Sequence, residues 1–169
     1  MNCHMPRINE GMQDVVRTHA IFSPTKPEMI EANHPNACNL CHVDRTIDWT
    51  LDHLQGWYGV TYAEDRLAAA YPYRERPAVV GWLKSHNEAV RLVATGALAR
   101  SDDNSALPEL IDVLDDPYLL NRQFAQISLE EKLDIRLLDF GYRFYMTAQE
   151  RREPLRKIRA HVLEQRATP

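Results

Sequence analysis

The spacing of apolar residues along the chain changes at Thr46. Between Thr46 and Gly56 the segment TIDWTLDHLQG places Ile47, Leu51 and Leu54 on one face of a helix, and Gly56 is expected to end it. The residues before Thr46 show little helical periodicity and include several prolines. The pattern therefore predicts an irregular first segment followed by helices, and it predicts no strand.

A second helix is expected over Tyr62–Ala70. Thr61 would be its N-cap, and Glu64 three residues later completes a capping-box pattern. Everything after Pro77 is helical in pattern and contains little glycine. The sequence thus favours a mostly α-helical protein.

The last predicted helix, over Arg151–Arg166, is basic and amphipathic. Thr147 and Glu150 form the pattern of another capping box that opens it. The preceding region, residues 102–139, is acidic. We therefore expect the basic helix to complement its acidic neighbour rather than to bind a membrane or a nucleic acid.

The second half of the chain contains a repeat. Val79–Leu98 aligns with Leu110–Leu129 at an offset of 31 residues. The identical positions are Leu83 and Leu114, Arg91 and Arg122, Ala94 and Ala125, and Leu98 and Leu129. Each copy reads as a helix, a short turn and a second helix, and such pairs bury their apolar faces by stacking on each other. The alternative is an ordinary antiparallel helical bundle with coincidental spacing.

Composition and charge exclude several classes of function. The 169 residues include 20 basic and 24 acidic side chains, which argues against a nucleic-acid-binding protein because such proteins need a basic surplus. No apolar run approaches the roughly 20 residues of a membrane span. There is no glycine-rich phosphate loop and no hydrolase or metalloprotease motif. No general acid, base or nucleophile constellation stands out, so a complete enzyme is not expected.

Cysteine and histidine are concentrated in the first 53 residues. This stretch holds all three cysteines (Cys3, Cys38 and Cys41) and five of the seven histidines (His4, His19, His34, His42 and His53). An irregular segment of this kind usually needs a metal, a cofactor or disulfides to hold it together. We therefore expect a non-protein group to be bound here.

Cys38-Asn39-Leu40-Cys41-His42 is a C-x-x-C-H sequence, the attachment motif of c-type haem. Thiols three positions apart can reach the two vinyl groups of a porphyrin, and the next residue can place its imidazole beneath the ring as the proximal iron ligand. One alternative is a zinc site formed by Cys38, Cys41, Cys3 and a histidine. A thioredoxin-like redox pair is a further alternative, although no βαβ pattern surrounds the motif.

The segment LPELIDVLDDPYLLNRQFAQISL resembles the HEAT repeat family, in its short variety of roughly 30 residues. Asn121 departs from the pattern, which usually has an apolar residue there. The resemblance covers about Pro77 to Leu133 and implies a scaffold or docking surface without chemistry of its own. It depends on Leu110, Leu114, Asp116, Pro117, Arg122, Ala125 and Leu129.

The first 59 residues resemble multihaem c-type cytochromes. The resemblance rests on C-H-M-P at Cys3, on T-H-A-I-F-S-P from Thr18, on Pro35–His42, and on W-T-L and W-Y-G after the motif. It implies that Cys3 and His4 are the remainder of a first C-x-x-C-H whose first cysteine would precede Met1. We therefore expect a fragment or a misplaced start, with a second haem if the chain extends upstream. Haem c is attached outside the cytoplasm, so the resemblance also implies a periplasmic or other extracytoplasmic location.

The sixth iron ligand is less well defined by the sequence. His19 is the first candidate, because it lies in a proline-bounded segment between the two motifs and matches the T-H-x-I/F-x-x-P stretch of the resembling family. His34 is the second candidate, and His53 is expected to be structural. Met5, Met12 and Met29 are further possible axial ligands. The aromatic residues Trp49, Trp57, Tyr58 and Tyr62 are expected to form core or a haem-packing surface.

Together these observations predict a mostly α protein with a loop-rich haem-binding segment at residues 1–60. HEAT-like repeats follow at residues 61–140, and the basic helix at residues 141–169 packs on them. The predicted function is an electron-transfer module that carries haem c and docks a redox partner protein. A fragment of a multihaem oxidoreductase is the other interpretation that the resemblance allows, and both are expected ahead of a complete enzyme. The alternative is a zinc-stabilised HEAT-like interaction protein without a redox role. The sequence does not indicate an oligomeric state.

Overall fold

The computed structural model describes residues 3–12, 14–23, 25–102 and 104–167, with side chains up to Val162. The described residues are mostly helical, as predicted. In chain order the elements are β1 (Arg7–Glu10), β2 (Val15–Arg17), α1 (Pro27–Glu31), α2 (Ala37–Cys41), α3 (Ile47–Tyr58), α4 (Glu64–Ala70), α5 (Ala78–Leu83), α6 (Glu88–Ala99), α7 (Leu107–Asp112), η1 (Val113–Asp115), α8 (Leu119–Leu133), η2 (Leu137–Phe140) and α9 (Ala148–Ala167).

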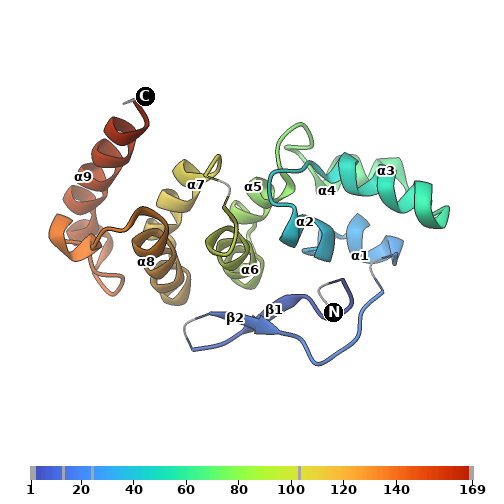
Figure 1. Cartoon of the computed structure of the whole chain (residues 1–169), viewed down its shortest axis with the longest axis horizontal. Helices are drawn as coiled ribbons and strands as arrows, with labels where there is room; N and C mark the ends of the chain where they lie inside the picture. The colour runs from blue at the N-terminus through green and yellow to red at the C-terminus, as the bar shows by residue number, and fades with distance from the viewer. Residues whose placement is uncertain (1–2, 13, 24, 103, 168–169) are drawn as a thin grey trace.

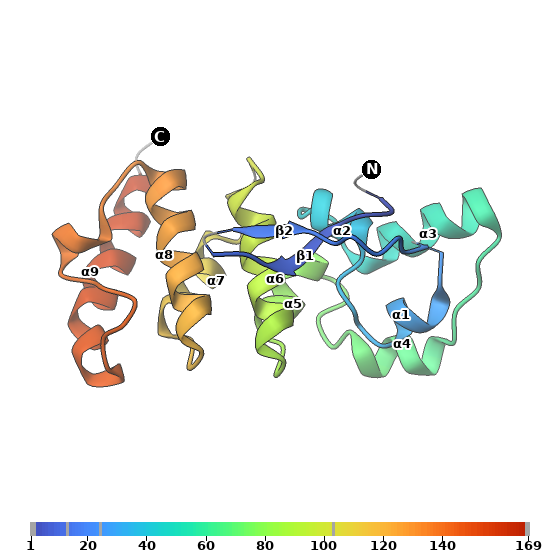
Figure 2. The same cartoon turned by 90° about the horizontal axis from the view of Figure 1, so that it is seen from below.

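The helices follow one another along the long axis of the molecule (Figure 1). Helices α1 to α4 gather at one end, and α5 to α9 extend from them to the other end. Figure 2 shows the β1–β2 hairpin crossing the surface of α6. Within the described residues the main apolar cluster runs from Ile30 of α1 to Val162 of α9, and a smaller one joins Val15 to Phe124. None of the described helices is both long enough and apolar enough to cross a membrane.

Helix α3 follows the predicted pattern at its start but ends later than expected. The Thr46 hydroxyl accepts a hydrogen bond from the Trp49 N–H (3.3 Å), and Ile47 is buried on the core-facing side. The helix continues through Gly56 to Tyr58. Gly59 ends it instead, in the left-handed conformation (φ 65°) that glycine adopts at low cost.

The capping box predicted for α4 is wrong. Helix α4 begins at Glu64, and its N-cap Ala63 has no side-chain hydrogen bond to give. The backbone N–H of Ala63 donates to the Glu31 carboxylate of α1 (2.7 Å), and the Glu64 carboxylate is paired with Arg74. Partners distant in sequence therefore provide the contacts that the local pattern assigned to Thr61.

The antiparallel β1–β2 hairpin was not predicted. Its strands have only four and three residues, too few for a clear alternation of apolar and polar positions. Val15 is fully buried against α6, at a point where Gly96 leaves space for it: a Cβ at Gly96 would lie 2.5 Å from Val15 Cγ2. The hairpin therefore depends on packing against α6 rather than on strand propensity.

The two aligned segments form two helix pairs, α5–α6 and α7–α8. Their matching arginines make the same contact: Arg91 Nη1 donates to the Ser85 carbonyl and Arg122 Nη1 to the Asp116 carbonyl, each at 2.6 Å and six residues earlier. Asn121, the departure from the repeat pattern, is fully buried and donates to the Glu88 carbonyl (3.3 Å). The repeat in the sequence thus corresponds to a repeated structural contact.

The last helix begins with the predicted capping box. The N–H of Thr147 donates to the Glu150 carboxylate (2.8 Å), and the N–H of Glu150 donates to the Thr147 hydroxyl (3.4 Å). Arg151 and Arg159 of α9 pair with Asp115 (2.7 Å) and Asp112 (2.8 Å). The basic helix therefore complements its acidic neighbours, as expected.

Candidate functional site

Cys38 and Cys41 lie on one turn of α2, and His42 is the residue that ends this helix. The Asn36 side chain caps the helix by accepting a hydrogen bond from the Asn39 N–H (2.9 Å). The His42 N–H donates to the Cys38 carbonyl (2.7 Å). Cys41 and His42 are exposed and Cys38 is partly buried, and both thiols are free. Residues three apart on a helix share a face, so the two thiols lie on the same side of α2.

The sequence reasoning missed Asn39, the residue that follows the first cysteine of the motif. It is fully buried. Its amide donates to the carbonyls of Arg45 (3.0 Å) and Thr46 (3.2 Å), and its Oδ1 accepts from the Thr50 hydroxyl (2.7 Å). These bonds join α2 to the start of α3. Thr50 was an available signal, because it is a polar residue on the otherwise apolar face of α3.

An aromatic row extends from His42 along α3. The ring centroids of His42 and Trp49 are 4.8 Å apart, those of Trp49 and His53 are 4.3 Å apart, and those of His53 and Trp57 are 5.1 Å apart. The His53 Nδ1 lies 2.7 Å from the Trp49 carbonyl, which orients its ring. The four-residue spacing from Trp49 to Trp57 places these rings on one side of the helix.

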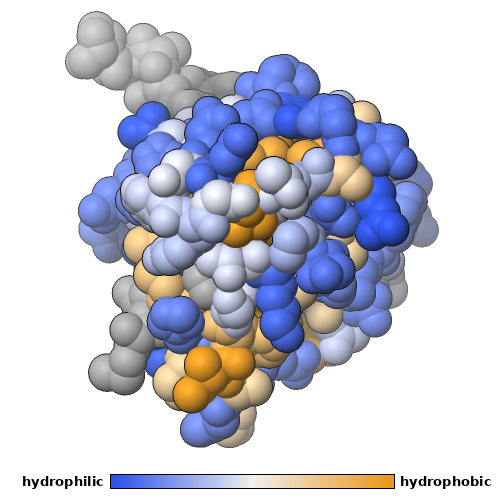
Figure 3. Space-filling model, turned by 90° about the vertical axis from the view of Figure 1, so that its right-hand side faces the viewer, coloured by the Kyte–Doolittle hydropathy of each residue, from blue (hydrophilic) through white to orange (hydrophobic). Residues whose placement is uncertain are grey.

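Part of this row lies at the surface. Trp57 and the neighbouring Tyr58 are both 64% exposed, so neither belongs to the core, and a haem-packing surface stays the prediction for these two residues. Figure 3 views the end of the molecule at which α3 and α4 lie, and its surface is mainly hydrophilic or intermediate, with small hydrophobic areas. Tyr62, in contrast, packs against the main core. The exposed Trp57 ring is therefore connected to His42 of the motif through His53 and Trp49.

The fold brings Cys3 close to Cys38. Burial raises the pKa of the Cys38 thiol, and the nearby Cys3 and Cys41 raise it further. Burial, followed by the charges of Cys38 and Glu31, raises the pKa of Tyr62 to about 12. The Tyr62 hydroxyl is buried without a hydrogen-bond partner among the described residues. The three cysteines thus belong to one region, although the first two are 35 positions apart in the sequence.

Cys3 and His34 line one cavity of about 40 Å³, together with Met29 and Phe22. This volume is suited to little more than water. His4 is exposed, its Nδ1 lies 3.0 Å from the Phe22 carbonyl, and its Nε2 has no hydrogen-bond partner among the described residues. Met1 and Asn2, the two residues that would precede Cys3 in a first motif, lie outside the described residues.

Within the described ranges, no hydrogen bond, ion pair or ring contact joins the His19 side chain to the motif. His19 is exposed and follows the buried Thr18, whose hydroxyl accepts from the Ala20 N–H (3.0 Å). His34 is also exposed, and its backbone N–H donates to the Met29 carbonyl (3.0 Å) just after α1. Both remain predicted ligands.

The donor chemistry of α2 fits covalent haem. Haem attachment requires two thiols on one helical turn and one imidazole, and Cys38, Cys41 and His42 supply these groups. A closed zinc site requires four converging ligands. Over the described part of the chain, no group of three or more His, Cys, Asp or Glu residues is arranged to hold a metal ion.

Comparison with protein-family models finds no matching family. Comparisons with curated proteins and with solved structures find no similar protein either.

Proposed function

We propose that the chain is an electron-transfer module that carries haem c on Cys38 and Cys41, with His42 as the proximal iron ligand. The observation that carries this proposal is the C-x-x-C-H sequence on a capped helix, with two free thiols on one face and an exposed imidazole at its end. The bound haem would supply one-electron chemistry at its iron.

Cys38 and Cys41 would hold the haem through one thioether bond each. Such a bond would need no oxidant, because the sulfur and the hydrogen of each thiol would add to the two carbons of one vinyl group. Cys41 is exposed and accessible for this addition, whereas Cys38 is partly buried. The Asn39 contacts to Arg45 and Thr46 hold both cysteines and His42 in fixed relation to α3. A rigid support of this kind orients a metal-binding imidazole.

Several further residues are candidates for setting the redox potential of the haem iron. His19 and His34 are the proposed sixth ligands, and bis-histidine ligation would give a lower potential than histidine–methionine ligation. The Trp49 ring, 4.8 Å from that of His42, would restrict the orientation of the ligand. Residues around an iron ligand tune potential through burial and hydrogen bonding.

The helical half of the chain is proposed to be a HEAT-like scaffold for a redox partner protein. The repeated contacts of Arg91 and Arg122 with the turns before their helices support this interpretation. Stacked helix pairs form extended surfaces suited to protein docking. Because covalent haem is attached outside the cytoplasm, the proposal includes a periplasmic or other extracytoplasmic location.

The test is to express the chain behind an export leader in a host that contains c-type haem maturation machinery. We expect haem that stays bound on a denaturing gel and a reduced pyridine spectrum of the c type. The variants C38A and C41A should each lose most of this haem. The matched control C3A should retain haem on the complete motif.

The ligand is tested separately with H42A and the control H86A, since His86 is an exposed histidine outside the motif. H42A should change the iron spectrum and H86A should not. Stoichiometric zinc with no covalent haem would overturn the proposal and favour the zinc-stabilised interaction module. Equal haem content in C38A, C41A and unmodified chain would also contradict it.

A further inference from the structure

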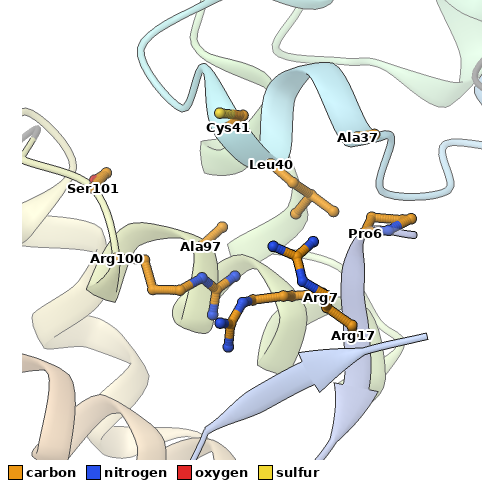
Figure 4. A pocket seen from close by; sticks show the side chains of 9 residues that line it. All are labelled: Pro6, Arg7, Arg17, Ala37, Leu40, Cys41, Ala97, Arg100 and Ser101. Carbon is orange, nitrogen blue, oxygen red and sulfur yellow. The ribbon is translucent and has the colours of Figure 1, made fainter. Parts of the chain in front are cut away.

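A pocket of about 220 Å³ lies where the hairpin meets α2 and α6. Three arginines line it from three elements: Arg7 from β1, Arg17 from β2 and Arg100 from the end of α6. Figure 4 shows their side chains reaching toward one another below Leu40 and Cys41 of α2. The proposed function uses none of these arginines.

The positive charge in this pocket is only partly balanced. Asp14 accepts from Arg7 Nη1 (2.9 Å) and from Arg100 Nη1 (3.1 Å), so two guanidinium groups share one carboxylate. Arg17 donates to a neutral group, the Met5 carbonyl (3.2 Å). Asp14 is itself about half exposed, at 51% of its side chain. Three positive charges therefore face one negative charge in a chain whose net charge is −4.

The strand register adds a second, independent observation. Arg7 and Arg17 are direct cross-strand partners in the hairpin. Like charges directly opposite each other destabilise an antiparallel pair. Burial lowers the pKa of Arg100, and the charges of Arg7 and Arg17 lower it further against the opposing effect of Asp14. The fold thus concentrates repelling cations, an arrangement that a bound anion would relieve.

We propose that this pocket binds a small oxyanion with two negative charges, of the sulfate or phosphate class. Guanidinium groups present forked N–H donors that match the oxygens of such anions. A volume of about 220 Å³ accommodates one tetrahedral anion with a few waters, since a water occupies roughly 30 Å³ of liquid volume.

The carboxylates of haem are a second source of the same chemistry, but the geometry favours a free anion. Thioether bonds join a porphyrin at the edge that carries the vinyl groups, and the propionates lie at the opposite edge. Cys41 lines the arginine pocket, so the arginines adjoin the attachment edge. The proposal therefore does not depend on haem being bound.

An anion held here would connect β1, β2 and α6. The hairpin packs on α6 mainly through Val15 and a small apolar cluster, so contacts at its arginines add to a limited interface. A ligand that binds only the folded chain stabilises it in proportion to its occupancy. We therefore expect the anion to fix the hairpin, and with it Cys3 and His4 just before β1, on the body of the protein.

The experiment titrates the full haem-free chain with sodium sulfate and with sodium phosphate against chloride at constant ionic strength. Calorimetry should show one saturable site, and the thermal midpoint should rise with either anion. R17Q and R100Q should each weaken binding about tenfold or more. The control R152Q removes an exposed arginine of α9 and should bind as the unmodified chain does.

R17Q has a second readout that separates binding from folding. Because it removes the like charge opposite Arg7, it should be at least as stable as the unmodified chain in chloride, yet should gain little from sulfate. Equal gains from sulfate in R17Q, R100Q and R152Q would indicate a general salt effect and overturn the proposal. Absence of saturable binding in the unmodified chain would do the same.

The last measurement repeats the sulfate titration on the chain after haem attachment. Retained sulfate binding supports a site for a free anion. Loss of sulfate binding on haem attachment, with binding intact in the haem-free chain, would assign the arginines to the haem carboxylates and overturn the free-anion proposal. Failure of haem attachment itself bears on the proposed function and leaves the haem-free titration as the test of this site.

Discussion

Arg91 of α6 and Asp116 of the loop before α8 form a two-pronged ion pair, with Nε–Oδ2 at 2.5 Å and Nη2–Oδ1 at 3.0 Å. The side chains are only 12% and 4% exposed. Asp116 also accepts from the Tyr118 N–H (2.8 Å) at the start of α8. This pair therefore joins the two helix pairs of the repeat at a mostly buried point.

Replacing Asp116 should destabilise the protein strongly. D116A leaves the Arg91 guanidinium buried without its carboxylate, and we expect a loss of about 3–5 kcal/mol in the free energy of unfolding. The measurement is urea unfolding followed by circular dichroism. The matched control E153Q breaks an exposed ion pair with Arg156 and should cause no measurable change. Similar losses of stability in D116A and E153Q would contradict a special contribution of the buried Arg91–Asp116 pair.

Asp116 should also make the free energy of unfolding depend on pH in the acid range. Burial alone would raise the pKa of Asp116, but the hydrogen bonds from Arg91 and the Tyr118 N–H outweigh it and hold the pKa below its ordinary value. The folded state therefore binds this proton less readily than the unfolded state. Its contribution is present above the ordinary pKa of about 3.9 and is lost as the pH falls through the folded value.

The destabilisation of D116N relative to the unmodified chain should therefore shrink below about pH 4. Unfolding in urea at a series of pH values measures it. A difference that stays constant down to about pH 2 would mean that the Asp116 charge does not contribute.

At alkaline pH the buried tyrosines should lower stability. The pKa of Tyr62 is raised to about 12, first by burial and then by Cys38 and Glu31, compared with an ordinary value of about 10. The folded state holds this proton more tightly, so stability is complete below about pH 10 and is lost as the pH rises toward 12. Y62F should reduce this alkaline loss.

Y62F should also leave stability at neutral pH within about 1 kcal/mol of the unmodified chain, because the Tyr62 hydroxyl has no hydrogen-bond partner among the described residues. Ultraviolet absorbance gives the tyrosine titration directly. If one tyrosinate signal near pH 12 persists in Y62F, another residue is responsible for it.

The two cysteines of the motif should differ in reactivity when haem is absent. Cys41 is exposed, whereas burial and the nearby Cys3 raise the pKa of Cys38. Since the thiolate is the reactive form, iodoacetamide should label Cys41 before Cys38 at neutral pH. Peptide mass spectrometry measures each site. C3S should increase the labelling rate of Cys38, and an unchanged rate would show that the two thiols do not interact.

Asn39 should support both folding and the site. N39A removes the donor for the carbonyls of Arg45 and Thr46 and the acceptor for Thr50, so we expect a loss of about 1–3 kcal/mol. If α2 must be held against α3 for attachment, the yield of covalent haem should also fall. Q55A, an exposed position on α3, is the control for both readouts. Unchanged stability in N39A would refute the supporting role.

The sequence alone determined those features that depend on neighbours within one or two helical turns. Short spacings predicted the buried face of α3 with Ile47 and Leu54, and both residues are buried. They also predicted the capping box of Thr147 and Glu150, which forms, and the matching positions of Arg91 and Arg122, which make the same backbone contact. The spacing of the C-x-x-C-H motif is local in the same sense, and its haem chemistry stays a prediction.

Tertiary structure decided whatever depends on distant partners. The start of α4 is set by Glu31, the hairpin forms because α6 offers space at Gly96, and three arginines from separate elements converge on one pocket. Cys3 and Cys38 likewise approach each other only in the fold. The physical reason is that short spacings constrain the chain through its own backbone geometry, whereas long-range contacts depend on which surfaces pack together.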